Sequence, residues 1–182
     1  QEIGIVTKLD ILEKQVKPTY LAIGSNLGNK LSNIEEAKNQ LLMNDITITD
    51  SSSYYKSPSW PNNNFPEFLN IVVKVKTEIS INNLFTIIKK IEKNIGRKNT
   101  PKNFPRVCDI DIIDFKGLNL KIDSDGKYIE TPHPRMQNRN FVIFPLFELD
   151  KTWIHPRTKV KINSIIKQFN NKDLSDIRIV KI

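Results

Sequence analysis

The 182-residue chain has a single cysteine, Cys108, which excludes an internal disulfide and favours a reducing cytoplasm as its location. Its longest uninterrupted apolar stretch runs only from Phe141 to Phe147 and contains a proline, so no membrane span is expected. The first residues carry charge early and have no long apolar run, unlike a secretory signal peptide. With 38% hydrophobic and 26% charged residues, the chain is expected to bury a core of its own.

The chain is basic, with 28 Lys and Arg against 20 Asp and Glu and a formal net charge of +8. Such a balance invites binding of nucleic acid or phosphate. However, 22 Lys, 20 Asn and 27 Ile make up much of the chain, and all three types have AT-rich codons. Genome composition therefore explains part of the charge, and the places where basic residues cluster carry more information than the total.

Hydrophobic periodicity and cap residues predict a series of short elements. Residues 1–17 show no motif and are interpreted as an N-terminal extension, with one domain over 18–182. The order strand, helix, strand, strand, helix, strand predicts an α+β sandwich of the split βαβ type. The expected elements are strands at 19–24, 46–53, 68–77 and 107–113, helices starting after Asn29 and Ser80, a hairpin bracketed by Gly117 and the turn Asp123–Gly126, an apolar helix or turn through Phe147, and one helix and an edge strand after Trp153.

The strongest chemical signal is Asp109-Ile-Asp111. Residues two apart on a strand share a face, so the two carboxylates project together while Cys108, Ile110 and Ile112 point into the core. Like charges on one sheet face repel, and a divalent cation that prefers oxygen ligands, most simply Mg²⁺, relieves that repulsion. The alternative is an exposed strand with two incidental acids, against which stands the depletion of Asp in strands.

A basic run precedes these acids. Arg97 and Arg106 flank the loop that enters the Asp strand, and arginine together with a metal suits a polyphosphate. By contrast, Lys89, Lys90 and Lys93 lie near the end of a helix, where cations complement the helix dipole, and they are interpreted as a solvated face.

The two histidines and the glycines carry weaker signals. His133, between two prolines, is either a structural hydrogen-bond donor or a site residue, and no second His or Cys lies nearby at metal-ligand spacing. His155 is expected to pack, and a core-facing Cys108 is not expected to act as a nucleophile. Gly24 to Gly28 matches neither phosphate-binding glycine motif and indicates only a tight turn.

A long loop offers groups for a flat heterocycle. Residues 57–66 contain three prolines and three successive asparagines, and loops of this length are often functional. Asn70 follows it and donates and accepts at once, which matches the edge of a pterin or purine.

Together these segments resemble the 6-hydroxymethyl-7,8-dihydropterin pyrophosphokinase family of folate synthesis. They keep the family's order and spacing over about residues 19–157. The matching pieces are Tyr20-Leu-Ala-Ile-Gly-Ser-Asn-Leu-Gly28, Ser53-Tyr-Tyr-Lys-Ser-Pro58, Phe68-Leu-Asn70, Ile91-Glu92 to Gly96-Arg97, Pro105-Arg106 to Asp109-Ile-Asp111, Pro132-His-Pro-Arg135 and Asn138-Arg-Asn-Phe141 to Pro145-Leu146.

The resemblance implies an antiparallel ferredoxin-like sheet flanked by helices, an αβα sandwich. It also implies transfer of pyrophosphate from ATP to the hydroxymethyl group of the pterin, with AMP as the leaving group. The implied site residues are Asp109 and Asp111 for two Mg²⁺ ions, Arg97 and Arg106 for catalysis, Glu92, Lys98, Ile112, His133 and Arg139 for ATP, and Ser57, Pro58, Trp60, Phe68, Asn70 and Phe141 for the pterin.

Two positions depart from the family pattern. Asn103-Phe104 stands where many members have Trp-Gly before Pro-Arg, and Asn99 stands where a further arginine is often found. The expected partners are small molecules, with no nucleic acid or membrane, and a monomer is expected. The competing hypotheses are a basic RNA-binding module, which lacks its usual aromatic strand motif here, and a Mg²⁺ phosphohydrolase using the same carboxylates.

Overall fold

The computed structural model describes residues 17–101, 103–124 and 126–182. The extension expected over residues 1–17 lies almost wholly outside them, so its boundary and the single domain at 18–182 remain predictions. The elements are β1 (Thr19–Ser25), α2 (Lys30–Leu42), β2 (Thr47–Ser51), β3 (Tyr54–Ser57), β4 (Phe68–Lys76), α3 (Ile81–Ile95), β5 (Asp109–Asp114), β6 (Leu120–Ser124), β7 (Lys127–Thr131), the 3₁₀ helix η1 (Met136–Asn138), α4 (Asn140–Leu149), α5 (Ile162–Ile166), α6 (Asn171–Ser175) and β8 (Arg178–Val180).

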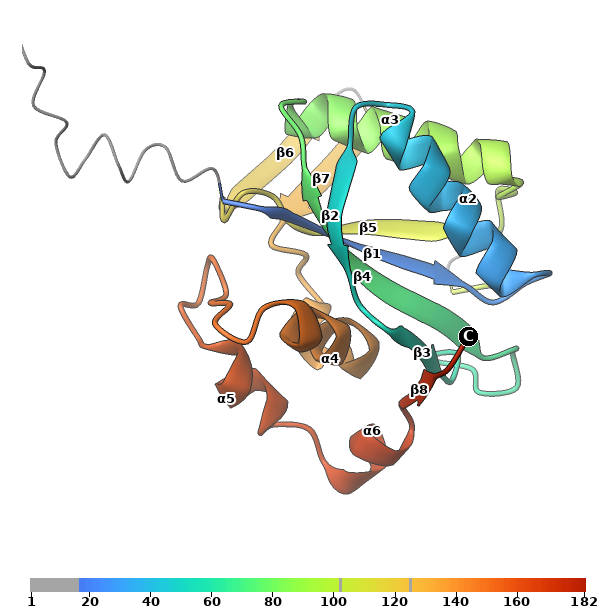
Figure 1. Cartoon of the computed structure of the whole chain (residues 1–182), viewed down its shortest axis with the longest axis vertical. Helices are drawn as coiled ribbons and strands as arrows, with labels where there is room; N and C mark the ends of the chain where they lie inside the picture. Colours follow the sequence, from blue (N-terminus) through green and yellow to red (C-terminus); the bar gives the residue numbers. More distant parts are fainter. Residues whose placement is uncertain (1–16, 102, 125) are drawn as a thin grey trace, which may run out of the picture.

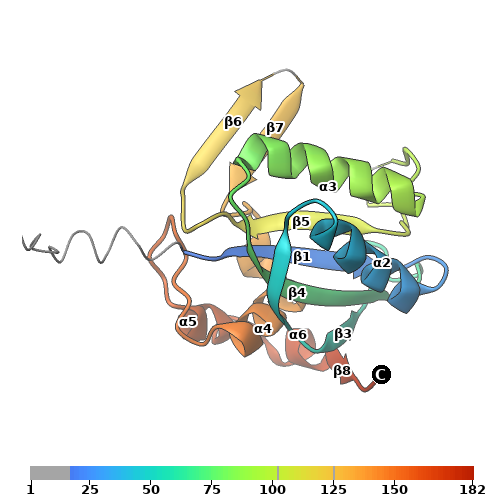
Figure 2. The same ribbon diagram turned by 45° about the horizontal axis from the view of Figure 1, so that its top comes forward.

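An antiparallel sheet in the order β5-β1-β4-β3-β8, with β2 also paired to β4, forms the middle layer. Helices α2 and α3 cover one face, and α4, α5 and α6 lie on the other (Figures 1 and 2). One buried apolar cluster lies beneath α2 and α3, and a second lies between the sheet and α4 and α5. This is the predicted αβα sandwich, and the hairpin predicted from Gly117 and the turn Asp123–Gly126 is β6-β7.

The predicted helix ends are confirmed. The side chain of Asn29 accepts a hydrogen bond from the Ser32 N–H at 3.1 Å, and that of Ser80 accepts one from Asn83. Gly96 ends α3 at φ +109°, a left-handed conformation that glycine adopts without steric cost.

The structure differs from the prediction around Ser52. The strand expected at 46–53 runs on to Ser57 as two segments, β2 and β3, which both pair with β4. Between them, Ser52 bonds Val72 twice, through its own N–H to the Val72 carbonyl and through its hydroxyl to the Val72 N–H. The serine thus keeps the strand attached where the backbone bends.

The C-terminal region also differs. Instead of one helix there are two short ones, α5 and α6, before the edge strand β8. Asn170 begins α6 through reciprocal hydrogen bonds with Asp173, a capping box that separates it from α5. None of the helices in the described ranges is long and apolar enough to cross a membrane.

Core packing under α3 provides a stability test. Leu84 is fully buried, so Leu84→Ala is expected to lower the free energy of unfolding by about 3 kcal/mol, because it removes apolar contacts and leaves a cavity. Leu42, 61% exposed at the end of α2, is the matched control, and Leu42→Ala should change the value by less than about 0.5 kcal/mol. Urea unfolding measures both, and equal effects would contradict the packing described.

Candidate active site

Three neighbouring strands form the floor of the site. In the register of β5, β1 and β4, Asp109 lies opposite Gly24, which lies opposite Asn70. Adjacent strands lie about 4.8 Å apart, so the carboxylate and the amide originate about 10 Å from each other. Gly24 leaves the space between them open, since a Cβ there would lie 2.9 Å from the Asn70 Oδ1. The turn glycine of the sequence is therefore part of the site floor.

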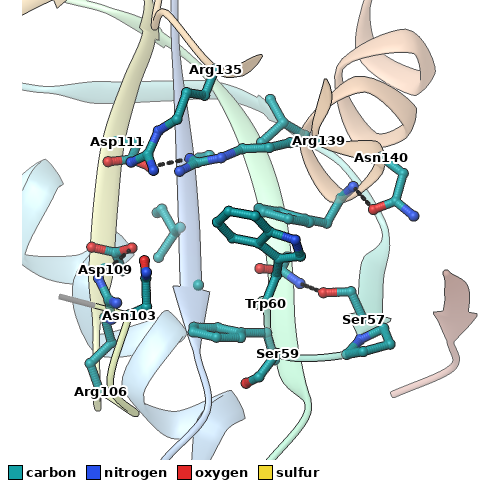
Figure 3. A pocket seen from close by; sticks show the side chains of 18 of the residues that line it. Ser57, Ser59, Trp60, Asn103, Arg106, Asp109, Asp111, Arg135, Arg139 and Asn140 are labelled. Carbon is teal, nitrogen blue, oxygen red and sulfur yellow. Dashed lines mark hydrogen bonds and ion pairs between the residues drawn. The ribbon is translucent and has the colours of Figure 1, made fainter. Parts of the chain in front are cut away.

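A pocket of about 790 Å³ opens over this floor, with walls formed by the loops at 57–68 and 97–106 and by the segment 135–142 (Figure 3). The structure brings most of the predicted site residues together there. Those that line it are Arg97, Lys98, Arg106, Asp109, Asp111, Arg139, Ser57, Pro58, Trp60, Phe68, Asn70 and Phe141.

Arginines neutralise Asp109 from two sides. Its Oδ1 accepts a hydrogen bond from Arg97 Nη1 at 2.7 Å, and its Oδ2 lies 3.3 Å from Arg106 Nη1. As the strand alternation predicted, Asp109 and Asp111 are part-exposed while Cys108, Ile110 and Ile112 are buried.

Asp111 has different partners, one arginine and one histidine. Arg139 Nη1 donates to its Oδ2 at 2.9 Å, and His133 Nε2 lies 3.9 Å from the same oxygen. Burial opposes ionisation of Asp111, but His133 and Arg139 outweigh it and hold the pKa of the carboxyl below its usual value. Burial lowers the pKa of His133. Since its Nδ1 accepts the Arg135 N–H, a neutral His133 carries its proton on Nε2, toward Asp111.

Glu92 lies beneath the Asp109 cluster, only 2% exposed. It accepts hydrogen bonds from Arg97, from Lys89 at 2.8 Å and from the Ile110 N–H at 2.8 Å. Burial raises the pKa of Glu92 against the opposing effect of Lys89. Glu92 therefore fixes Arg97 from behind and joins α3 to β5. Lys89 is exposed, as the sequence suggested, but it also lines the pocket and pairs with Glu92.

At the other end of the floor, polar and aromatic groups face the pocket. Asn70 Nδ2 donates to Ser57 Oγ at 3.0 Å, and the rings of Phe68 and Phe141 line the walls. Arg139 lies over the Phe141 ring at 5.7 Å, which links this end to Asp111. Trp60 is 69% exposed at the rim.

Asn26 joins the two loops that border the pocket. Its amide donates to Ser59 Oγ and to the Pro66 carbonyl, both at 3.1 Å, and its carbonyl accepts from the Arg106 N–H at 2.7 Å. The residue is 1% exposed. Only a turn was predicted here, because no pattern within one segment indicates which distant loops the Asn26 amide will bond.

Comparisons with known proteins show which family the chain belongs to. The model of the family described as 7,8-dihydro-6-hydroxymethylpterin-pyrophosphokinase (HPPK) matches residues 20–151. The chain belongs to the HPPK family. A 2-amino-4-hydroxy-6-hydroxymethyldihydropteridine pyrophosphokinase of Aquifex aeolicus is 38% identical over 137 residues, which cover 75% of this chain and 82% of the relative. The protein of that name from Haemophilus influenzae is 32% identical over 152 residues, 82% of this chain and 91% of the relative.

Other relatives of this HPPK-family chain are much longer. The folic acid synthesis protein FOL1 of Dictyostelium discoideum is 39% identical over 79% of the chain, which spans only 21% of that protein. A crystal structure of a Plasmodium falciparum HPPK-DHPS variant with pterin and p-hydroxybenzoate has a TM-score of 0.69 at 14% identity, over 97% of this chain and 50% of that one. At this low identity, the likeness to the Plasmodium structure establishes the fold alone. The family match confirms the resemblance and the expected enzyme class, an ATP-dependent pyrophosphokinase of folate synthesis.

Three predicted site residues lie outside the pocket lining: Glu92, Ile112 and His133. Each lies directly behind or beside a lining residue. Conversely, the sequence prediction missed Arg135 and three residues of the C-terminal region, Lys172, Asp173 and Asp176, that do line it. Arg135 belongs to the family-like motif Pro132-His-Pro-Arg135, whereas the α6 residues belong to no recognisable motif.

The remaining expectations concern individual side chains. Cys108 is 1% exposed and burial raises its pKa to about 12, which fits the core role predicted for it. His155 is buried and its Nδ1 accepts two backbone N–H groups, a packing role as expected. The displaced aromatic Phe104 contacts Phe65 of the other loop at 5.5 Å between ring centres, and Asn99 lines the pocket beside Lys98.

The donors at Asp109 and Asp111 fit a magnesium ion. They are part-exposed carboxylates on one strand face, opening to the pocket. In the described part of the chain no group of three or more His, Cys, Asp or Glu forms a complete metal cage. Mg²⁺ commonly takes one or two carboxylates and completes its shell with water and substrate phosphates, which is what this pair offers.

The position of Glu92 generates a prediction. Glu92→Gln keeps the acceptor for the Ile110 N–H but removes the charge that holds Arg97, so kcat is expected to fall about tenfold. Steady-state kinetics with ATP and the pterin measure this. Glu36→Gln, on the exposed face of α2, is the control and should keep wild-type kinetics; unchanged kcat in Glu92→Gln would contradict the positioning role.

Proposed function

We propose that the pocket transfers the terminal diphosphate of ATP to 6-hydroxymethyl-7,8-dihydropterin. The observation that carries the proposal is the arrangement of Asp109 and Asn70 on one sheet floor, separated by the bare Gly24. A carboxylate pair with arginines suits a polyphosphate, and an amide with two aromatic walls suits a flat heterocycle. A polyphosphate bound at the carboxylate end and a heterocycle bound at the Asn70 end would therefore meet, with their reacting groups facing each other, over Gly24.

The pterin occupies the Asn70 end in this proposal. Phe68 and Phe141 hold its flat ring, and Asn70 and Ser57 meet its polar edge. Pro58 and Trp60 close the rim. The hydroxymethyl group then points along the floor toward Asp109 and Asp111.

ATP occupies the Asp109 end. Arg97 and Arg106 approach from the side of Asp109, and Arg139 approaches from the side of Asp111, so charge on the phosphoryl oxygens is met from both sides. Lys98 lines the same end. We assign Glu92, His133 and Ile112 a supporting part, in which they hold Arg97, Asp111 and the strand in place.

The reaction proceeds by attack of the pterin hydroxyl oxygen on the β-phosphorus of ATP. The bond from the β-phosphorus to the bridging oxygen breaks, and AMP leaves with that oxygen, while the hydroxyl proton passes to solvent. The protein's own contribution is alignment and charge stabilisation. Two Mg²⁺ ions at Asp109 and Asp111 would supply neutralisation of the phosphates and polarisation of the phosphoryl oxygens.

We further propose that the chain works as a monomer on small molecules, without nucleic acid. Asp109 and Asp111 sit on the face where an RNA-binding sheet presents basic and aromatic groups, and they would repel a nucleic-acid backbone. The cytoplasm stays the proposed location, because the single cysteine leaves no internal disulfide to protect.

The direct test incubates the chain with ATP, Mg²⁺ and the hydroxymethyl-dihydropterin. AMP and pterin diphosphate are expected, and AMP only when the pterin is present. Asp109→Asn and Asp111→Asn should each lower the rate roughly a hundredfold or more, because they remove a carboxylate charge at the phosphate end. Asp123→Asn, on the exposed hairpin, should not. ADP as product, or consumption of ATP without pterin, would instead indicate a phosphotransferase or a phosphohydrolase.

Arg135 provides a second prediction. It lines the pocket and lies beside Asp111 and Arg139 in Figure 3, and within the described residues its guanidinium has no carboxylate partner. Its charge is thus open to the phosphates. Arg135→Gln is expected to weaken ATP binding about tenfold and to leave pterin binding unchanged. Calorimetric titration measures both, with Lys151→Gln as a charge-matched control outside the pocket; equal ATP affinity in the two variants would contradict this role.

A further inference from the structure

The segment from Asn170 to Val180 lies beyond residues 20–151, which match the family model, yet it reaches the pocket. Lys172, Asp173 and Asp176 line the pocket next to Asn140 and Phe141. Figure 1 shows α6 leading into β8, which is the edge strand of the sheet beside β3. The segment thus forms a wall at the end assigned to the pterin.

One contact attaches this segment to the Phe141 wall. Asn140 Nδ2 donates to the backbone carbonyl of Asp173 at 2.7 Å, while Asn140 Oδ1 accepts from the Phe141 N–H at 2.7 Å. Asn140 is thereby fixed by both of its side-chain groups. The hydrogen bond to α6 acts on the residue that directly precedes the Phe141 ring.

A second contact attaches the segment to the Phe68 wall. Arg178 Nη2 lies 2.9 and 3.0 Å from the two carboxylate oxygens of Glu67, the residue that directly precedes Phe68. The strand pairing continues this link, because Arg178 lies opposite Lys56, next to Ser57 at the end of β3.

We infer that residues 170–180 act as a clamp that sets the spacing of Phe68 and Phe141 and so determines pterin affinity. A flat ring stacked between two aromatic side chains requires those two side chains to lie about 7 Å apart. If they move apart by even less than about 1 Å, the dispersion contacts with the ring between them weaken sharply. A single segment bonded to the residue before each ring holds that spacing. This inference rests on the proposed function, which assigns the pterin to these rings.

The sharpest test uses the ion pair, because neither residue lines the pocket. Arg178→Glu places two like charges together and is expected to raise the pterin Kd and KM about threefold, with kcat and the KM for ATP unchanged. The double variant Glu67→Arg with Arg178→Glu restores the attraction and should return both pterin constants to near wild type. Lys151→Glu carries the same charge change away from the pocket and is the control.

The contact between α6 and Asn140 is tested with separate variants. Asn140→Ala removes the bond to Asp173 and is expected to raise the pterin Kd about fivefold. Because Asn140 itself lines the pocket, Asn170→Ala is paired with it: it loosens the capping box of α6 without touching the lining and should give a smaller rise in the same direction. Asn163→Ala in α5 is the control.

The outcomes separate the two proposals. A selective rise in the pterin constants, reversed by the charge swap, supports the clamp. A loss of kcat without a change in pterin affinity would show only destabilisation and would overturn it, as would wild-type pterin constants in Arg178→Glu and Asn170→Ala. If the wild-type chain neither binds the pterin nor forms AMP, the proposed function fails and the clamp fails with it.

Discussion

Repulsion between Asp109 and Asp111 governs what surrounds them. Two carboxylates on one face of a strand require positive charge close by, and the chain supplies it from separate directions: Arg97 and Arg106 contact the first, and Arg139 contacts the second, with the His133 ring beside it. Glu92 in turn neutralises Arg97 from below. The resulting network of alternating charges joins α3 and β5 to the segments on either side of η1, so the residues proposed to bind phosphate also hold these elements together.

The net charge of the chain has little bearing on this network. A total of +8 suggested a polyanion, but Lys90 and Lys93 are exposed on α3 and contribute nothing to the pocket. What matters is local: arginines set around two acids leave space and charge for one polyphosphate. A large polyanion such as a nucleic acid would instead need a continuous basic surface.

Sequence patterns predicted what depends on neighbours along the chain. The cap at Asn29, the left-handed end at Gly96 and the alternation of β5 all follow from a few adjacent residues, and the structure has each of them. Contacts between distant segments left no such pattern. The amide of Asn26 binds two loops 33 and 80 residues away, and α6 meets Asn140 across 33 residues, so neither role was predictable from a local motif.

The two kinds of contact correspond to two kinds of constraint on function. Asp109 and Asp111 stand on the edge strand β5, and Asn70 stands on the central strand β4. Both strands pair with β1 between cores packed on both faces of the sheet, so the relative positions of these residues are fixed by the backbone ladder. The arginines of 97–106, the rim residue Trp60 and α6 stand on loops or a short helix joined by individual hydrogen bonds. Segments held by few bonds open at low free energy, which suits walls that must admit and release two substrates. The strands thus hold the groups proposed for the reaction at fixed positions. Binding and release of substrates depend instead on the contacts of the loops and the C-terminal segment, which substitutions in those segments can change.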